Sequence, residues 1–126
     1  MASDPGEAVV REFVRTFNEG DLDGFEATLD PEVELHSMKG IRTGIPAARK
    51  WANRVPGGVQ QTVVITSIES VGEKLLVRIR RDWHWAEDDS HAGSDDMAWF
   101  FLLKNGRIRA WRPFVDTAEA FAAFNA

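Results

Sequence analysis

The sequence contains no cysteine and no tyrosine. Without cysteine the protein has no disulfide bond, thiolate nucleophile or zinc–sulfur site, a composition that fits a reducing compartment, so we expect a cytoplasmic protein. Without tyrosine, every mechanism that needs a phenol hydroxyl is excluded. No apolar run reaches the roughly 18 residues of a membrane span, and the N-terminal residues lack the basic and apolar regions of a signal peptide, so we expect neither.

An excess of basic residues is also missing. The 126 residues include 15 Lys and Arg against 20 Asp and Glu, for a net charge of −5. This is the wrong sign for binding a phosphate backbone, so we expect no nucleic-acid partner. The content of 44% hydrophobic and 28% charged residues is typical of a folded globular protein. The length suits one domain over residues 1–126, with a core and room for a cavity.

Three helices are predicted in the first half of the chain. The first starts at a capping box over Asp4–Glu7 and carries one apolar stripe at helical spacing. The second is capped by Asp21 and extends to Leu29, and the third spans Pro46–Arg54. Between the second and the third, alternation of apolar and polar residues predicts a short strand over Val33–His36.

The second half is rich in β-branched and aromatic residues and predicts strands. The ranges are Thr62–Ile68, Lys74–Trp85, Met97–Leu103 and Arg107–Val115, followed by a short helix after Asp116. Helices that are segregated from an antiparallel sheet make an α+β domain. The sequence therefore predicts three N-terminal helices, an antiparallel meander and a short C-terminal helix.

One predicted strand bears on the oligomeric state. Met97–Leu103 is apolar at both odd and even positions, and a strand that is apolar on both faces is covered on both. The N-terminal helices cover one face, and a second subunit is the simplest cover for the other. We therefore predict a homodimer that packs through the sheet, the alternative being a sheet that curls to cover itself.

Segments along nearly the whole chain resemble the NTF2-like superfamily in its SnoaL-like branch. The similar segments are Val9–Phe13, Asn18–Phe25, Leu29–His36, Lys104–Ile108 and Trp111–Asp116. The resemblance implies a cone-shaped, curved antiparallel sheet wrapped on three helices and enclosing a deep pocket. That fold hosts isomerases, dehydratases, cyclases, epoxide hydrolases and binding domains, so the resemblance specifies the fold more closely than the function.

The chain is also similar to the limonene-epoxide hydrolases, which use an Arg-x-Asp pair on one strand and a second Asp on the last strand. This resemblance places Arg80 and Asp82 on the pair, but the second Asp falls on Pro113, which cannot accept a proton. It places Glu34 and His36 at positions that help to hold the attacking water. Ketosteroid isomerases keep their base on the same short strand, whereas their oxyanion tyrosine has no counterpart here.

These residues suit proton transfer. His36 is the candidate general base or acid, because histidine titrates near neutrality. Arg80 and Asp82 leave the same face of a strand, so Arg80 would hold Asp82 charged or stabilise an oxyanion, and Asp82 would orient His36 or the substrate. Glu34 is a second candidate carboxylate. The structural alternative is a hydrogen-bonded histidine, a solvated Glu34 and a surface ion pair of small energy.

Asp116 has two interpretations. SnoaL-type cyclases use an acid–base Asp near the end of the chain after a Trp, and Asp116 follows Trp111 in a similar way. Asp116 also stands where the final helix begins, and Asp is a favoured N-cap residue.

Periodicity and resemblance disagree about which face of the strands forms the pocket. Periodicity buries Val77 and Ile79 and leaves Arg80 and Asp82 in water, whereas the resemblance puts Arg80 and Asp82 in the pocket. The same disagreement holds for the short strand Val33–His36. We adopt the placement that the resemblance implies, because the strand Met97–Leu103 is apolar on both sides and independently indicates two buried faces.

A cavity lined by aromatic rings would suit a flat apolar ligand. The candidate lining residues are Phe17, Trp51, Trp99, Trp111 and Phe114. The run over residues 87–96 carries five carboxylates and one histidine, but it lacks the spacing of a calcium loop, and an acidic hairpin tip explains it. We expect no metal and no cofactor.

Three functions follow from these expectations. The leading hypothesis is a cofactor-free enzyme that moves a proton on an apolar, cyclic or polyketide-like substrate, by isomerisation, dehydration, cyclisation or epoxide hydrolysis. The second is a small-ligand-binding module of the same fold without turnover. The third is a dimerisation domain whose pocket is filled by its own side chains.

Overall fold

The computed structural model describes residues 5–37, 40–52, 59–85, 87–115 and 117–125. In chain order these form α1 (Pro5–Glu19), α2 (Leu22–Ala27), β1 (Leu29–Ser37), β2 (Gly40–Thr43), α3 (Ile45–Ala52), β3 (Val59–Val71), β4 (Lys74–Trp85), β5 (His91–Lys104), β6 (Arg107–Phe114) and α4 (Thr117–Asn125). The predicted α+β class, with three N-terminal helices and a short C-terminal helix, is confirmed.

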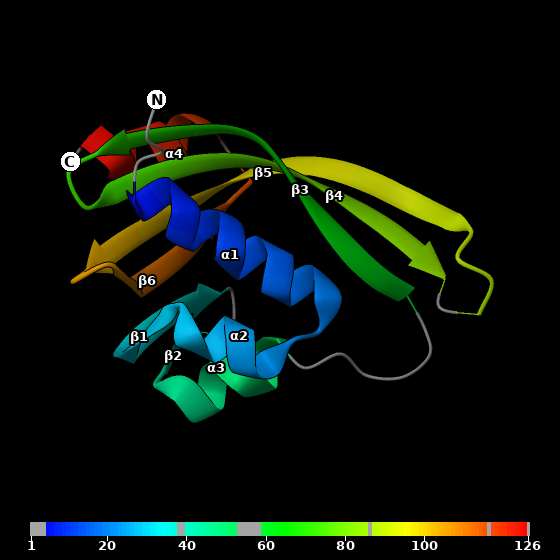
Figure 1. Cartoon of the computed structure of the whole chain (residues 1–126). Coiled ribbons are helices and arrows are strands. Elements are labelled where there is room, and N and C mark those ends of the chain that lie inside the picture. The colour runs from blue at the N-terminus through cyan, green and yellow to red at the C-terminus, as the bar shows by residue number, and fades with distance from the viewer. Residues whose placement is uncertain (1–4, 38–39, 53–58, 86, 116, 126) are drawn as a thin grey trace.

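The six strands of this described part make one curved sheet in the order β2-β1-β6-β5-β4-β3. Neighbouring strands in the sheet run antiparallel, apart from β1 and β6, which run parallel. The helix α1 lies across the hollow face of the sheet, with α2 and α3 beside it, and α4 lies against the other face (Figure 1). No helix in the described ranges is both long and apolar enough to cross a membrane.

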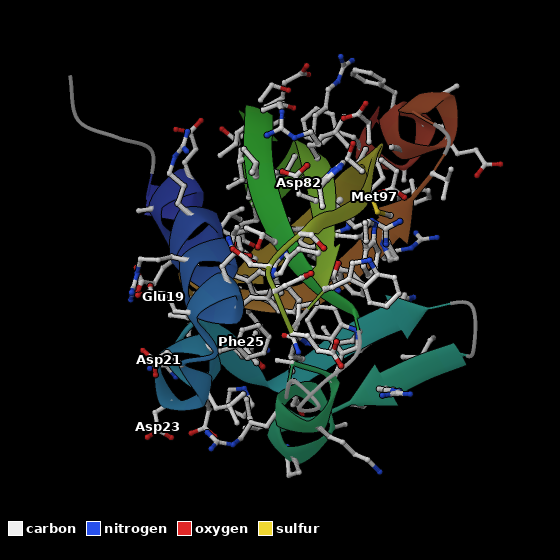
Figure 2. All side chains as sticks on the ribbon, turned by 90° about the vertical axis from the view of Figure 1, so that its right-hand side faces the viewer. Glu19, Asp21, Asp23, Phe25, Asp82 and Met97 are labelled. Atoms are coloured by element: carbon white, nitrogen blue, oxygen red, sulfur yellow. The ribbon has the colours of Figure 1, made fainter. Side chains whose placement is uncertain are left out.

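The helices begin and end where local chemistry favours it. Pro5 opens α1 at the first helical position, where its missing N–H costs nothing, and Gly20 ends the helix with φ +70°, a conformation that glycine adopts without strain. The Asp21 carboxylate caps α2 by accepting a hydrogen bond of 3.0 Å from the backbone N–H of Gly24. Figure 2 shows Asp21 at the outer edge of α2 and Phe25 directed inward.

Several strand boundaries differ from the sequence prediction, among them those of β3 (predicted as Thr62–Ile68), and β2 was not predicted. The starts of β1 and β5 differ for a reason that the pairing of strands explains. The second helix ends at Ala27, and Leu29 begins β1 instead of ending that helix. The reason is tertiary: Leu29 pairs with Ile108 of β6, and the N–H of Ile108 donates to the carbonyl of Thr28 at 2.8 Å. Likewise β5 begins at His91, inside the acidic segment predicted as a hairpin tip, because it pairs with the far end of β4.

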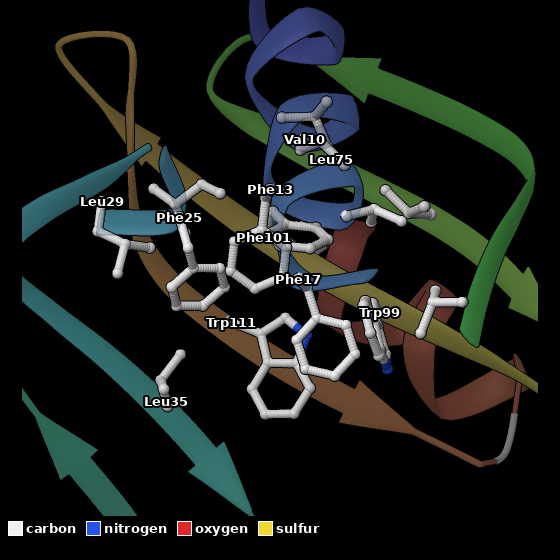
Figure 3. Close-up of a cluster of buried hydrophobic side chains, with 14 of the residues drawn as sticks. Val10, Phe13, Phe17, Phe25, Leu29, Leu35, Leu75, Trp99, Phe101 and Trp111 are labelled. Atoms are coloured by element: carbon white, nitrogen blue, oxygen red, sulfur yellow. The ribbon is translucent and has the colours of Figure 1, made fainter. Parts of the chain in front are cut away.

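The main core lies between the hollow face of the sheet and α1–α3. Val10, Phe13 and Phe17 project from α1 onto odd-numbered residues of β4 and β5, which alternate toward this face. The Phe13 ring has no exposed surface and contacts four other aromatic rings at centroid distances from 4.8 to 6.3 Å. Figure 3 shows this aromatic cluster beneath α1.

A second apolar cluster lies on the opposite face of the sheet. Leu76, Ala98 and Phe100 are buried there under Ala120 and Phe124 of α4. This corrects the reasoning behind the predicted homodimer, because α4, and not a second subunit, covers the other apolar face of β5. The homodimer stays a prediction, without that reason to support it.

The edge strand β3 is protected by a side chain of α1. The Asn18 amide group donates to the carbonyl of Val63 at 2.8 Å, and its oxygen accepts from the N–H of Val63 at 2.9 Å. Asn18 thus pairs the outward backbone groups of Val63 as another strand would. An edge strand with unpaired backbone groups is a site where other chains add and aggregate. The Asn18 side chain blocks such pairing at Val63.

Replacing Asn18 by alanine is expected to lower the free energy of unfolding by about 2 kcal/mol, because both backbone groups of buried Val63 lose their partner. Urea unfolding followed by circular dichroism measures this. Glu19→Ala is the control, since Glu19 forms an exposed ion pair with Arg15, and its loss is expected to cost less than about 1 kcal/mol. Equal effects of the two substitutions would show that the Asn18–Val63 contact is not needed for stability.

Candidate ligand cavity

A cavity of about 320 Å³ opens on the hollow face of the sheet, between α3 and strands β3–β6. Strand alternation brings its lining residues together from segments far apart in the sequence. The lining residues are Trp51 of α3, Gln61 of β3, Arg81 of β4, Met97 and Trp99 of β5, Trp111 and Pro113 of β6, and Val115. This volume is at the lower end of the range of small-molecule sites.

Three indole rings dominate the wall. The centroid of the Trp111 ring lies 4.8 Å from that of Trp51 and 5.4 Å from that of Trp99, the latter pair meeting edge to face at 81°. Phe17 and Phe13 pack behind Trp51, at centroid distances of 5.3 and 6.3 Å. The rings therefore support one another and present a rigid, largely apolar wall.

Among the described residues of this lining, Arg81 is the ionisable one. Its Nε donates to Oδ1 of Asp95 at 2.8 Å, and its Nη2 donates to Oδ2 of the same carboxylate, so the pair is bidentate. The guanidinium also lies over the Trp83 ring, 5.1 Å from its centroid. The hydrogen bond from Arg81 lowers the pKa of Asp95, with a small further contribution from Trp83. Asp95 is therefore held as a carboxylate at neutral pH, which makes it a weak proton acceptor.

Three polar atoms of the lining residues have no hydrogen-bond partner among the described residues. They are Nε1 of Trp99, Nε1 of Trp111 and Oε1 of Gln61, each with less than 1 Å² exposed. Leaving a buried donor or acceptor unpaired costs about 1–3 kcal/mol, and native proteins do so rarely. The wall thus combines a large apolar area with a few unpaired polar atoms.

Of the aromatic residues predicted to line the cavity, Trp51, Trp99 and Trp111 do so. Phe17 lies behind Trp51 in the core, outside the lining. Phe114 was wrongly placed: it packs with α4 on the opposite face of the sheet, where the Arg112 guanidinium lies 5.2 Å from its ring centroid. The reason is strand alternation on β6, which turns Trp111 and Pro113 to the cavity and Phe114 away from it.

The predicted placement of Arg80 and Asp82 in the cavity is wrong. Ile79 is buried in the main core and Arg81 lines the cavity, so the residues between and beside them project to the other face. There Arg80 Nε donates to Asp82 Oδ2 at 3.2 Å, in an ion pair whose Arg80 side chain is 49% exposed. The apolar periodicity predicted correctly which residues of β4 face the core, and the resemblance predicted it wrongly.

Glu34 and His36 also lie outside the cavity. Val33 and Leu35 are buried in the main core, so the residues that alternate with them project to the other face. Glu34 Oε2 accepts from Arg109 at 2.9 Å, and Glu34 Oε1 lies 3.4 Å from His36 Nε2. Asp116 lies outside the described residues. The structure therefore does not bring the other four predicted catalytic residues to the cavity; these are Glu34, His36, Arg80 and Asp82.

Sequence reasoning missed Gln61, Arg81, Met97 and Val115 as lining residues. A signal for Arg81 is present in the sequence, because it has the same phase on its strand as Val77 and Ile79. A charged residue on the apolar phase of a strand is unusual and indicates a special partner or a ligand. Within the described residues, no group of three or more His, Asp or Glu side chains is placed to hold a metal ion.

A family model described as a SnoaL-like domain matches residues 10–111, which is most of the chain. The chain belongs to the SnoaL-like family. The family includes isomerases, cyclases and epoxide hydrolases, as the resemblance implied. No curated protein matches the sequence.

Solved structures similar to this SnoaL-like chain agree on the fold. An LEH-like epoxide hydrolase from M. tuberculosis is 19% identical with a TM-score of 0.75, over 96% of this chain and 90% of that chain. An NTF2-like protein of unknown function from Burkholderia pseudomallei is 21% identical with a TM-score of 0.74, over 98% and 100%. TerC, co-crystallised with polyporic acid, is 14% identical with a TM-score of 0.75, over 98% and 100%. At these identities the likeness establishes the NTF2-like fold alone.

In this SnoaL-like chain, the positions of the epoxide-hydrolase pattern lie on both faces of the sheet. Pro113, the position to which the resemblance assigned the second Asp, does line the cavity. The Arg-x-Asp pair lies on the other face, so the cavity offers neither carboxylate of that pattern at the assigned positions. Arg81 and Asp95 are instead the charged pair that this SnoaL-like chain places beside the cavity.

Proposed function

We propose that this protein binds a small, flat, largely apolar molecule in the cavity, with an acidic oxygen of the ligand at Arg81. The observation that carries the proposal is the lining: three indoles with Met97, Pro113 and Val115 supply flat apolar contact. Arg81, in its bidentate pair with Asp95, supplies a guanidinium donor. A few convergent polar groups in an apolar wall are typical of sites that bind small molecules.

Arg81 is prepared for this role. Asp95 and the Trp83 ring hold the guanidinium in one orientation, so binding an anion costs little side-chain entropy. The Arg81 side chain keeps 25% of its surface exposed, so it remains accessible at the edge of the cavity. The structural neighbour TerC was co-crystallised with polyporic acid, and an acid is the kind of occupant that Arg81 would favour here.

Binding without turnover, the second function considered from the sequence, is supported better than the leading enzyme hypothesis. An acid–base enzyme needs a group that exchanges a proton with the ligand, and the lining offers no carboxylate or histidine within the described residues. Asp95 is the carboxylate joined to the lining through Arg81, and its lowered pKa makes it a weak base. Among the described residues, the Arg81–Asp95 pair is the ionisable pair that reaches the lining.

The test uses 2-naphthoate, a flat apolar molecule with one carboxylate, titrated calorimetrically into the protein. Arg81→Gln is expected to weaken binding about tenfold, because one charged hydrogen-bonding partner is lost. Arg80→Gln is the matched control: it removes the same charge one residue away, on the opposite face of β4, and is expected to leave binding unchanged.

Failure of 2-naphthoate to bind, or equal weakening by Arg80→Gln and Arg81→Gln, would contradict the proposed site. Turnover of an epoxide or a cyclic ketone by the wild-type protein would overturn the proposal of binding without turnover. Loss of that turnover in Asp95→Asn would show that the Arg81–Asp95 pair takes part in the proton transfer. The cytoplasmic location and the homodimer stay predictions.

A further inference from the structure

The charged group at the edge of the cavity is a pair whose two charges cancel. Arg81 lies directly opposite Asp95 in the pairing of β4 with β5. Its Nε and Nη2 donate to the two oxygens of that carboxylate, so the contact is bidentate. The cavity therefore has a guanidinium donor beside it, but the pair as a whole contributes no net positive charge.

Asp95 is on the same face of β5 as the cavity lining. Alternate residues of a strand leave the same face, and Asp95 alternates with Met97 and Trp99, which both line the cavity. Its side chain is 46% exposed, which places the carboxylate at the rim of the cavity and not in its wall. A ligand oxygen that reaches Arg81 therefore also comes close to the carboxylate of Asp95.

No second cation is placed to balance a ligand with more than one negative charge. On its other side, Arg81 pairs across β3 with Val63, which is buried and apolar. Gln61 and Met97, which line the cavity next to Arg81 on the two neighbouring strands, are uncharged. Within the described part of the lining, Arg81 is thus the single cation, and Asp95 already offsets its charge.

We infer that the ligand presents a single negative charge to Arg81, and that Asp95 is the specificity-determining residue that excludes a second one. This inference rests on the proposed binding function and names its ligand class: a flat acid with one charge, as opposed to a phosphate monoester. The guanidinium has five N–H donors, so it can donate to a ligand oxygen while it keeps its two bonds to Asp95. A second negative charge on the ligand would meet the Asp95 carboxylate without a counterion.

The test compares 2-naphthyl sulfate with 2-naphthyl phosphate. Both have the same rings and a tetrahedral head, but at about pH 8 the sulfate carries one negative charge and the phosphate close to two, since its second pKa is about 6. Calorimetric titration into the wild-type protein is expected to give an affinity for the sulfate that is about tenfold higher than for the phosphate.

Asp95→Asn removes the charge and keeps the shape and one acceptor oxygen for Arg81. This variant is expected to bind the phosphate about tenfold more tightly than the wild type and the sulfate about threefold more tightly, so the preference for the single charge falls. Asp96→Asn is the matched control. It removes the same charge from the next residue, which pairs with Arg80 and projects to the other face, and is expected to change both affinities by less than about twofold.

The outcomes separate this inference from the proposed function. Equal affinities of the wild type for sulfate and phosphate would overturn the selection of a single charge and leave the binding function standing. So would an Asp95→Asn variant that binds both compounds equally more weakly, because Asp95 would then only hold Arg81 in place. Binding of 2-naphthoate without binding of the sulfate would show that the shape of the head selects the ligand. Failure of 2-naphthoate and the sulfate together would overturn the binding function as well.

A second measurement on the wild-type protein decides the question if Asp95→Asn does not fold. Lowering the pH from about 8 to about 5.5 adds a proton to most of the phosphate and leaves the charge of the sulfate unchanged. We expect the affinity for the phosphate to rise toward that for the sulfate, while the affinity for the sulfate stays constant. A phosphate affinity that does not respond to its own protonation would overturn the inference.

Discussion

Replacing Ala120 by aspartate is expected to lower the free energy of unfolding by about 2–4 kcal/mol. Ala120 has no exposed surface and faces Leu76, Ala98 and Phe100 in the apolar cluster under α4. A carboxylate at this position would be buried without a partner, so the helix is expected to leave the sheet instead. Because α4 is the cover of this face, its release exposes a contiguous apolar surface.

Two measurements check this expectation. Urea unfolding gives the change in stability, and sedimentation velocity detects the self-association that an exposed apolar face promotes. Ala122→Asp is the matched control, because Ala122 is an exposed alanine of the same helix and should tolerate the charge within about 0.5 kcal/mol. Equal stability of the two variants would show that α4 does not cover the sheet in solution.

The same experiment bears on the predicted homodimer. The part of this face beyond α4 carries Arg80 and Asp82, which are charged and at least partly exposed. A wild-type chain that is monomeric, together with an Ala120→Asp variant that associates, would show that α4 replaces the partner subunit. A wild-type dimer that withstands Ala120→Asp would place the subunit interface elsewhere.

Replacing Phe13 by alanine is expected to cost about 3–5 kcal/mol of stability, the largest effect of a single substitution considered for this protein. The Phe13 ring is fully buried and meets Phe25, Trp51, Trp99 and Phe101. Two of those rings form the cavity wall, so the void left by the missing ring lies directly behind it. Native packing is dense, and so the surrounding rings recover only part of the lost contact.

Equilibrium unfolding in urea, followed by tryptophan fluorescence and circular dichroism, measures this loss. Arg11→Ala on the exposed side of the same helix is the control and is expected to change stability by less than about 0.5 kcal/mol. A loss below about 1 kcal/mol for Phe13→Ala would mean that the ring is not enclosed as described.

Most of the element order could be predicted from local patterns. The strand Lys74–Trp85 was predicted with its observed bounds, and the first helix was located by its capping and its apolar stripe. These features depend on contacts between near neighbours in the chain, such as the apolar stripe of a helix or the alternation of a strand. The prediction failed where a long-range partner decided the structure, as at Leu29, which left the second helix to pair with β6.

The candidate site was predicted less well, for a related reason. Residues two apart on a strand share a face, but which face forms the cavity depends on the other layers of the fold. The apolar phase of β4 already indicated that Ile79 points to the core and Arg80 away from it. The resemblance to the epoxide hydrolases outweighed that pattern, and this choice misplaced Arg80 and Asp82.

The sequence by itself determined the SnoaL-like fold, the phase of the strands and the tryptophans available to a cavity. Only the tertiary structure decided that Arg81, Asp95 and the three indoles meet at one place, and that α4 covers the second face of the sheet. The physical reason is that spacing along the chain governs which residues share a strand face or a helix stripe. Contacts between residues distant in sequence arise only when strand register and layer packing are set together.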